Sequence, residues 1–325
     1  MPADSGSELI IYAVPVFLFL MLVEWLYFRS QNKNVYSAKD TLTNISCGAG
    51  QALFDGLALI LLLSLYNKLQ IFLGITPIAI TPLSFFISFI AVDLSYYVYH
   101  RLSHKVPFMW AIHVAHHSSS EYNFSVGLRQ AWFHKLTAFP FYLVLVVTGL
   151  PANLIGIVIA THACLQLLTH TKAFKKEIPL LRWIFVTPSH HRVHHGVQKQ
   201  YWDKNFSGIF SFWDRLFKSY TPETEPVQYG ISPQLKTHNP WNINTHFWKE
   251  LFPKSAMFTQ VSASKLQFSL VWLFLFFLGL FFITLLFLFF QNQMTLLMRI
   301  ICTGLLMAAY AFWGALMDTP NKNIN

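Results

Sequence analysis

Long apolar runs separated by polar connections dominate this chain. Apolar runs of roughly 20 residues, enough to cross a hydrocarbon core about 30 Å thick, predict membrane-spanning helices. We interpret 136–168 as a tight helical hairpin that turns at Gly149, Leu150 and Pro151. The pattern predicts an all-α fold, a polytopic membrane bundle of about seven spans: 9–28, 53–73, 82–99, 136–150, 151–168, 268–290 and 294–316.

Composition and charge agree with this class and suggest an orientation. Charged residues make up 11% of the chain, against about 25% in soluble domains. If the chain starts outside and crosses seven times, all Lys and Arg residues except Lys68 and Arg299 fall on one side, which should be cytoplasmic. The net charge of +9 then reflects this bias and attraction to anionic headgroups. The positive charge favours a membrane surface over nucleic acid as its partner, because the sequence has no compact basic soluble domain that could bind nucleic acid.

Histidines gather where spans reach the cytoplasmic side. The chain has 14 histidines, and three motifs, HRLSH, HVAHH and HHRVHH, hold most of them. Spacings of three and four place imidazoles on one side of a helix. The third motif has a helix start, with Thr187 as N-cap and Pro188 at the first helical position. The candidate ligands in these motifs are His100, His104, His113, His116, His117, His191, His194 and His195.

Eight converging imidazoles predict two metal ions. One zinc ion takes four protein ligands in a structural site, or three plus water in a catalytic one. Imidazole suits zinc, copper, iron and nickel alike, so the ligand type does not choose the metal. An iron pair that activates dioxygen and a metal pair that hydrolyses a substrate both stay open at this point. A partly solvated histidine pair at a membrane boundary explains one motif, but not three on one side.

The three motifs resemble the histidine boxes of the fatty acid hydroxylase and sterol desaturase superfamily, which are membrane di-iron oxygenases. The resemblance covers about residues 20–220. The segments VDLSYYVYHRLSH, WAIHVAHHSSSEYNFSVGLRQ and TPSHHRVHHGVQKQYWDKNFSGIFSFWDRLF are similar to the alkylglycerol monooxygenase branch in particular. One position departs from that branch, since Lys105 follows HRLSH where the branch usually has Glu.

The resemblance implies a cytoplasmic helical cap that holds two iron ions. There, O2 and an electron donor would hydroxylate or desaturate a C–H bond of a membrane lipid. The eight box histidines become iron ligands, and His170 matches a further histidine that the superfamily places between its second and third boxes. The branch uses tetrahydrobiopterin, which makes that cofactor possible here. The predicted domains are N-terminal transmembrane helices at 1–81, a catalytic region at 82–222, a cytoplasmic loop at 223–267 and an anchor pair at 268–325, the last outside any site.

Other polar residues within or beside the spans carry weaker expectations. Asp93 lies in an apolar span, where carboxylates are costly and usually paired or functional, so we expect it to support a ligand imidazole. His162 lies about 12 Å deeper along its helix than His170, which favours a buried hydrogen bond over metal binding. His190 is left open as a ligand or as a residue that supports one.

A second hypothesis of a different class is a membrane metal transporter or metal sensor with a histidine-rich cytoplasmic face. Transport sites are expected near the bilayer midplane. The histidine motifs instead lie at the ends of spans, with only Asp93 and His162 deeper. Their position therefore favours the oxygenase.

Overall fold

Helices make up the regular structure throughout the described part of the chain, as expected for an all-α fold. The computed structural model describes residues 5–174, 179–256, 259–264 and 266–319. An isolated bridge between Phe185 and Phe210 is the β pairing within these ranges. The longer helices are α1 (Ser5–Ser30), α2 (Ala38–Phe72), α3 (Pro82–Lys105), α4 (Pro107–His117), α5 (His134–Leu143), α6 (Ala152–Leu167), α10 (Pro240–Leu251), α11 (Leu270–Phe290) and α12 (Leu296–Met317).

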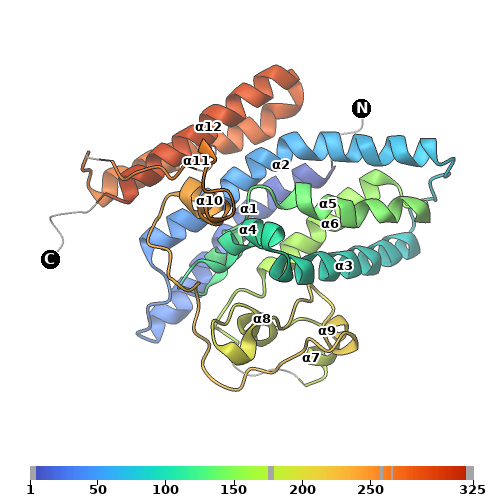
Figure 1. Cartoon of the computed structure of the whole chain (residues 1–325), viewed down its shortest axis with the longest axis horizontal. Coiled ribbons are helices and arrows are strands. Elements are labelled where there is room, and N and C mark those ends of the chain that lie inside the picture. The colour runs from blue at the N-terminus through green and yellow to red at the C-terminus, as the bar shows by residue number, and fades with distance from the viewer. Residues whose placement is uncertain (1–4, 175–178, 257–258, 265, 320–325) are drawn as a thin grey trace.

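Short elements fill the connections. The one-turn to two-turn helices are α7 (Leu181–Ile184), α8 (Pro188–His194) and α9 (Phe212–Leu216), and the 3-10 turns are η1 (Phe124–Leu128), η2 (Val144–Thr148), η3 (Lys199–Tyr201) and η5 (Gln291–Gln293). Figure 1 shows α7, α8 and α9 together on one side of the long helices, while α11 and α12 lie on the opposite side. The segment from 180 to 220 is therefore a cap of short helices and loops.

Five helices of the described chain are long and apolar enough to cross a membrane. They are Tyr12–Ser30, Ala38–Phe72, Pro82–Lys105, Leu270–Gln293 and Leu296–Met317. The expected hairpin turn is present, because Gly149 has φ +76° and its N–H bonds Val146 O at the end of η2. Its two arms, α5 with η2 and then α6, lie within two residues of the predicted 136–150 and 151–168. The 16 residues of α6 extend only about 24 Å, less than a hydrocarbon core of about 30 Å.

Helix α2 begins well before the span at 53–73 that the hydropathy indicates. Ser37 caps it by accepting a hydrogen bond from Asp40 N, and the helix then runs for 35 residues. Its first turns bury small polar side chains, Thr43, Asn44 and Ser46, against other parts of the protein. Hydropathy misses this half of α2 because its buried face is polar.

Helix α2 contributes to several apolar cores, and two of them join it to the other long helices. One joins α2 to α3, α5, η2 and α6 through residues such as Tyr66, Val92, Phe139 and Val158. The other packs α2 against α11 and α12 through residues such as Leu53, Phe277 and Trp313. The C-terminal pair therefore packs on α2, and α10 packs both on α4 and on α12.

Candidate metal centre and lipid cavity

Nine buried or half-buried histidines converge in two groups. Within each group, one ligand nitrogen per residue lies within 4.8 Å of all the others. The five-histidine group is His100, His104, His113, His117 and His194, and the four-histidine group is His116, His170, His191 and His195. These are the nine histidines that the sequence motifs and the resemblance selected.

Four chain segments deliver these side chains. His100 and His104 lie one turn apart at the end of α3, and His113, His116 and His117 occupy the last turns of α4. The third motif forms α8, which starts as expected, with Thr187 accepting a hydrogen bond from His190 N and Pro188 in the first turn. His170 follows the end of α6. The helix ends thus meet at a single place.

Backbone carbonyls fix the orientation of several rings. The Nδ1 atoms of His100, His116 and His194 lie 2.7, 3.1 and 3.0 Å from the carbonyl oxygens of Phe206, Arg129 and Lys204. A carbonyl oxygen only accepts hydrogen bonds, so each Nδ1 must carry the ring proton. The Nε2 lone pair of each ring is then free to bind a metal ion, as in known histidine sites.

The Nε2 atoms point toward one another at short range. The distances are 2.9 Å between His100 and His113, and 3.0 Å between His170 and His191. The Nε2 atoms of His104 and His194 are buried without any hydrogen-bond partner among the described residues. Buried polar atoms are normally paired. Converging lone pairs and two orphaned nitrogens fit cations in the centre of each group.

Burial keeps the imidazoles outside the spans in the form that binds metals. Desolvation lowers the pKa of His170 and of His194 to about 4. Desolvation and the neighbouring imidazoles hold the pKa of His195 well below the usual value. These rings are neutral at pH 7, and neutral imidazole is the ligand form.

The two groups adjoin each other. The rings of His117 and His195, one from each group, stack with their centroids 4.4 Å apart. The His116 and His195 ring centroids are 4.6 Å apart. The arrangement therefore fits two neighbouring metal ions rather than two independent sites.

Asp214 organises the loop that supports two of these histidines, and the sequence motifs did not reveal this role. Its carboxylate accepts hydrogen bonds from Phe206 N, Ser207 N and Ser219 Oγ at 2.7 to 2.9 Å. It also lies 2.9 Å from His190 Nε2. Burial alone would raise the pKa of Asp214, but hydrogen bonds with the side chains of His190, Ser207 and Ser219 lower it to about 2. Asp214 thus fixes residues 204–207, whose carbonyls hold His100 and His194.

The remaining predicted residues lie beside the two groups. His190 belongs to neither group, and its Nε2 lies 2.9 Å from Asp214 Oδ2. His162 makes the expected buried hydrogen bond, with Nε2 at 2.6 Å from Asp93 Oδ1. Asp93 also accepts from Ile209 N, Phe210 N and Trp213 Nε1, so its contacts are with the cap and His162 and not with a histidine of either group.

Gly208 sits where the cap lies close against α6. A Cβ atom at this position would lie 2.6 Å from Gln166 Nε2 and 2.6 Å from His162 Cε1. We expect Gly208→Ala to lower the free energy of unfolding by about 1 to 3 kcal/mol through overpacking. Gly279→Ala in α11 is the matched control, because its Cβ would meet nothing within 4 Å. That change should be neutral or stabilising by up to about 1 kcal/mol. Thermal unfolding in nanodiscs measures both, and equal effects would contradict the close approach.

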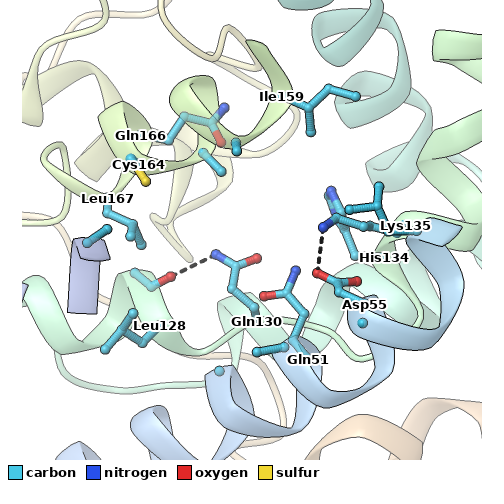
Figure 2. Close-up of a pocket in the computed structure, with 18 of the residues that line it drawn as sticks. Gln51, Asp55, Leu128, Gln130, His134, Lys135, Ile159, Cys164, Gln166 and Leu167 are labelled. Atoms are coloured by element: carbon cyan, nitrogen blue, oxygen red, sulfur yellow. Dashed lines mark hydrogen bonds and ion pairs between the residues drawn. The ribbon is translucent and has the colours of Figure 1, made fainter. Parts of the chain in front are cut away.

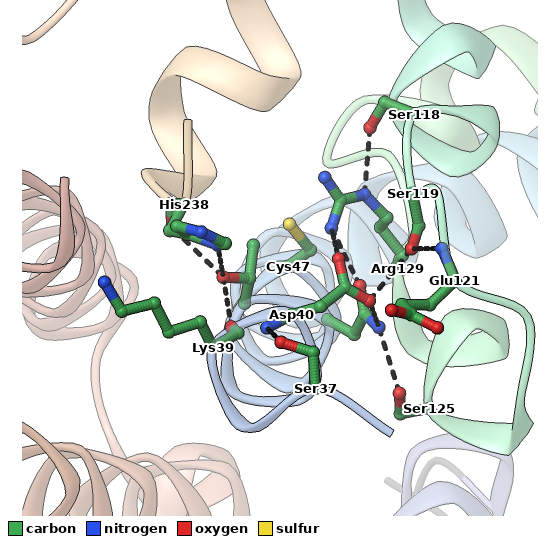
Figure 3. A network of polar contacts seen from close by, with 12 residues as sticks. Ser37, Lys39, Asp40, Cys47, Ser118, Ser119, Glu121, Ser125, Arg129 and His238 are labelled. Carbon is green, nitrogen blue, oxygen red and sulfur yellow. Dashed lines mark hydrogen bonds and ion pairs between the residues drawn. The ribbon is translucent and has the colours of Figure 1, made fainter. Parts of the chain in front are cut away.

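A buried polar network lies behind His116. Figure 3 shows the Arg129 guanidinium reaching Ser118 and Asp40. Arg129 Nε donates to Ser118 Oγ at 2.9 Å, and Nη1 lies 3.2 Å from Asp40 Oδ1 and 2.8 Å from Asn44 Oδ1. Since the Arg129 carbonyl accepts the proton of His116 Nδ1, this network ties the first turns of α2 to the four-histidine group.

A cavity of about 280 Å³ extends from the histidines between the long helices. Its walls are mostly apolar residues of α1, α2, α5, α6 and α11, such as Phe17, Leu59, Phe139 and Phe281. His113, His116, His170 and His191 also line it, so both groups face this space. Figure 2 shows part of its polar lining. Helix α11 of the C-terminal pair therefore lines the same cavity as the histidines.

The family model described as "Fatty acid hydroxylase" matches residues 85–219. This stretch contains all nine histidines of the two groups. Residues 85–219 belong to the fatty acid hydroxylase family. Within this hydroxylase region, Lys105 is exposed at the end of α3 and does not line the cavity.

Similarity to known proteins extends beyond residues 85–219. Alkylglycerol monooxygenase of Xenopus tropicalis is 32% identical over 244 residues, which are 74% of this chain and 53% of that protein. The Homo sapiens protein of that name is 31% identical over 262 residues, 77% of this chain and 57% of its own length. Ornithine lipid hydroxylase OlsE of Rhizobium tropici is 26% identical over 156 residues, 45% of each chain. The chain thus spans about half the length of the alkylglycerol monooxygenases it matches. No solved structure matches it.

Proposed function

We propose that this chain is a membrane-bound di-iron oxygenase that uses O2 to hydroxylate a C–H bond of a lipid, with an alkylglycerol-type ether lipid as the substrate. The observation that carries the proposal is the cavity with its apolar walls, which reaches both buried histidine groups from among the long helices. A lipid chain fits such walls, and the histidines lie where a chain in the cavity would be held.

The nine grouped histidines would hold the metal pair. His100, His104, His113, His117 and His194 supply one set of imidazoles, and His116, His170, His191 and His195 supply the other. Iron in these positions would supply the activation of O2. The hydroxylase and monooxygenase names of the relatives support iron over a hydrolytic metal pair.

The chain's own residues bind, orient and exclude water. The carbonyls of Phe206, Lys204 and Arg129 keep three imidazoles in one tautomer and direction. The apolar walls remove water from the lipid and from the histidines, which strengthens electrostatic interactions there. The cavity sets which carbon lies nearest to the histidines, and so decides between hydroxylation, desaturation and ether cleavage.

We infer that the short hairpin of α5, η2 and α6 adds two crossings to the five long helices, which makes seven. Because α6 extends only about 24 Å, the bilayer must thin around it. We also infer that the cap faces the cytoplasm. The distribution of Lys and Arg, with Lys68 and Arg299 as the exceptions, supports this orientation. Electrons must come from a donor on the same side. Tetrahydrobiopterin is the candidate that follows from the alkylglycerol monooxygenase branch.

Metal analysis and turnover test the proposed function. Protein purified into nanodiscs should bind about two iron ions and convert 1-O-hexadecylglycerol only when O2 and a reductant are present. Removal of iron with a chelator should stop conversion, and iron should restore it. Metal that exchanges freely and crosses the membrane of proteoliposomes, without lipid conversion, would instead support a transporter.

A further inference from the structure

The cavity contains a polar patch that neither the histidine groups nor the family match accounts for. Asp55 of α2 and Lys135 of α5 form an ion pair, with Nζ 3.0 Å from Oδ2. Gln51 lies four residues before Asp55, on the same face of α2, and Gln130 approaches from the loop before α5. Figure 2 shows these side chains directed toward a common part of the cavity that they line.

The second oxygen of the Asp55 carboxylate lacks a partner. Oδ1 has no hydrogen bond among the described residues, and it is buried, since only 9% of the side chain is exposed. An unpaired buried carboxylate oxygen is costly, so the position favours a ligand that donates a hydrogen bond. Lys135 already neutralises the charge, which leaves no net positive charge to attract a phosphate. The amides of Gln51 and Gln130 add both donors and acceptors.

We propose that Asp55, with Lys135, Gln51 and Gln130, is a subsite that binds the hydroxyl groups of a neutral lipid headgroup. The inference rests on the proposed function, since it concerns the substrate of that site. A hydroxyl donates to Asp55 Oδ1, while the apolar walls of the same cavity hold the alkyl chain. The subsite thereby sets the depth at which the lipid lies and selects a hydroxyl-bearing headgroup over a methylated or phosphorylated one.

Binding to the purified, iron-loaded protein in nanodiscs tests the subsite. The probes are 1-O-hexadecylglycerol, its 2,3-di-O-methyl ether, which has no O–H donor, and hexadecyl phosphate. We expect the diol to bind at least about tenfold more tightly than the dimethyl ether, as for a hydrogen bond to a charged group. Equal binding of the diol and the dimethyl ether, or tightest binding of the phosphate, would overturn the inference.

Variants separate recognition from structure. The double variant Asp55→Leu with Lys135→Met replaces the pair by apolar residues of similar size. It should bring the ratio of the affinities for the diol and the dimethyl ether close to one, and it should keep its bound iron. Lys68→Met, which removes an exposed charge on the same helix, should keep the preference. Gln51→Leu should reduce the preference several-fold, and it keeps the test open if the double variant fails to fold.

The outcomes also separate this inference from the proposed function. Wild-type protein that binds the diol selectively but never oxidises it would overturn the proposed function alone. If the protein oxidises the diol but binds the diol and the dimethyl ether equally tightly, only the subsite is overturned. Unchanged selectivity in the double variant would also overturn the subsite, because it would show that the ion pair does not recognise the hydroxyl groups.

Discussion

His194→Ala should abolish detectable lipid oxidation and lower the bound iron to about one ion per chain. Its Nδ1 proton is fixed by the Lys204 carbonyl, and its buried Nε2 has no partner among the described residues, as expected for a metal ligand. Losing a residue that supports a ligand costs roughly 10- to 100-fold in metal affinity or activity, so losing a ligand itself should cost more. Turnover assays and iron analysis on the same preparation measure both effects.

The control for His194→Ala is a histidine outside the two groups. His246 lies on α10, half-buried, and its Nδ1 contacts the Ile243 carbonyl of the same helix. His246→Gln should retain two iron ions and full turnover. Full activity in the His194 variant, with iron content equal to that of the control, would show that His194 does not bind the metal.

Asp214→Asn should weaken iron binding by about 10- to 100-fold and lower the free energy of unfolding by about 3 kcal/mol or more. The carboxylate accepts hydrogen bonds from both Phe206 N and Ser207 N. Asparagine has one acceptor oxygen, so part of this set is lost and the carbonyls that hold His100 and His194 shift. Competition with a chelator gives the iron affinity, and chemical denaturation in detergent gives the stability.

Excess iron should restore part of the turnover of the Asp214 variant, which a merely unstable protein would not show. Asp203→Asn is the matched control, beside residues 204–207, the loop that Asp214 fixes. Asp203 is exposed, and its φ of +55° suits asparagine equally well. This variant should bind iron as the wild type does. An Asp214 variant with unchanged iron affinity would mean that the loop holds its shape without the carboxylate.

Helical periodicity made the candidate ligands predictable from the sequence. The spacings within HRLSH, HVAHH and HHRVHH selected eight of the nine grouped histidines, and the family resemblance added His170. The same periodicity explains the division into groups. Neighbours on a helix point about 100° apart, so His116 leaves the group of His117, and His194 leaves that of His195. His113 and His117, at spacing four, stay together.

Helical periodicity did not predict the loop at 204–207 or the face of α11 that lines the cavity. Residues 204–207 lie in a loop whose shape depends on a left-handed residue, Asn205 with φ +57°, and on Asp214 several residues later. The run of Leu, Phe and Ile in α11 is equally apolar all round, so the sequence does not show which face lines the cavity.

The carbonyl contacts of residues 204–207 have a consequence for the order of assembly. His100 and its partner Phe206 are separated by 106 residues, and His194 is oriented by Lys204 of the same loop. Contacts between residues so far apart in sequence form late, because the entropy of closing the intervening chain must be overcome first. During synthesis, α3 and α4 therefore emerge with incomplete ligand sets. Only a chain that has docked its cap possesses a whole metal centre, and α11, which completes the cavity walls, is synthesised after the cap.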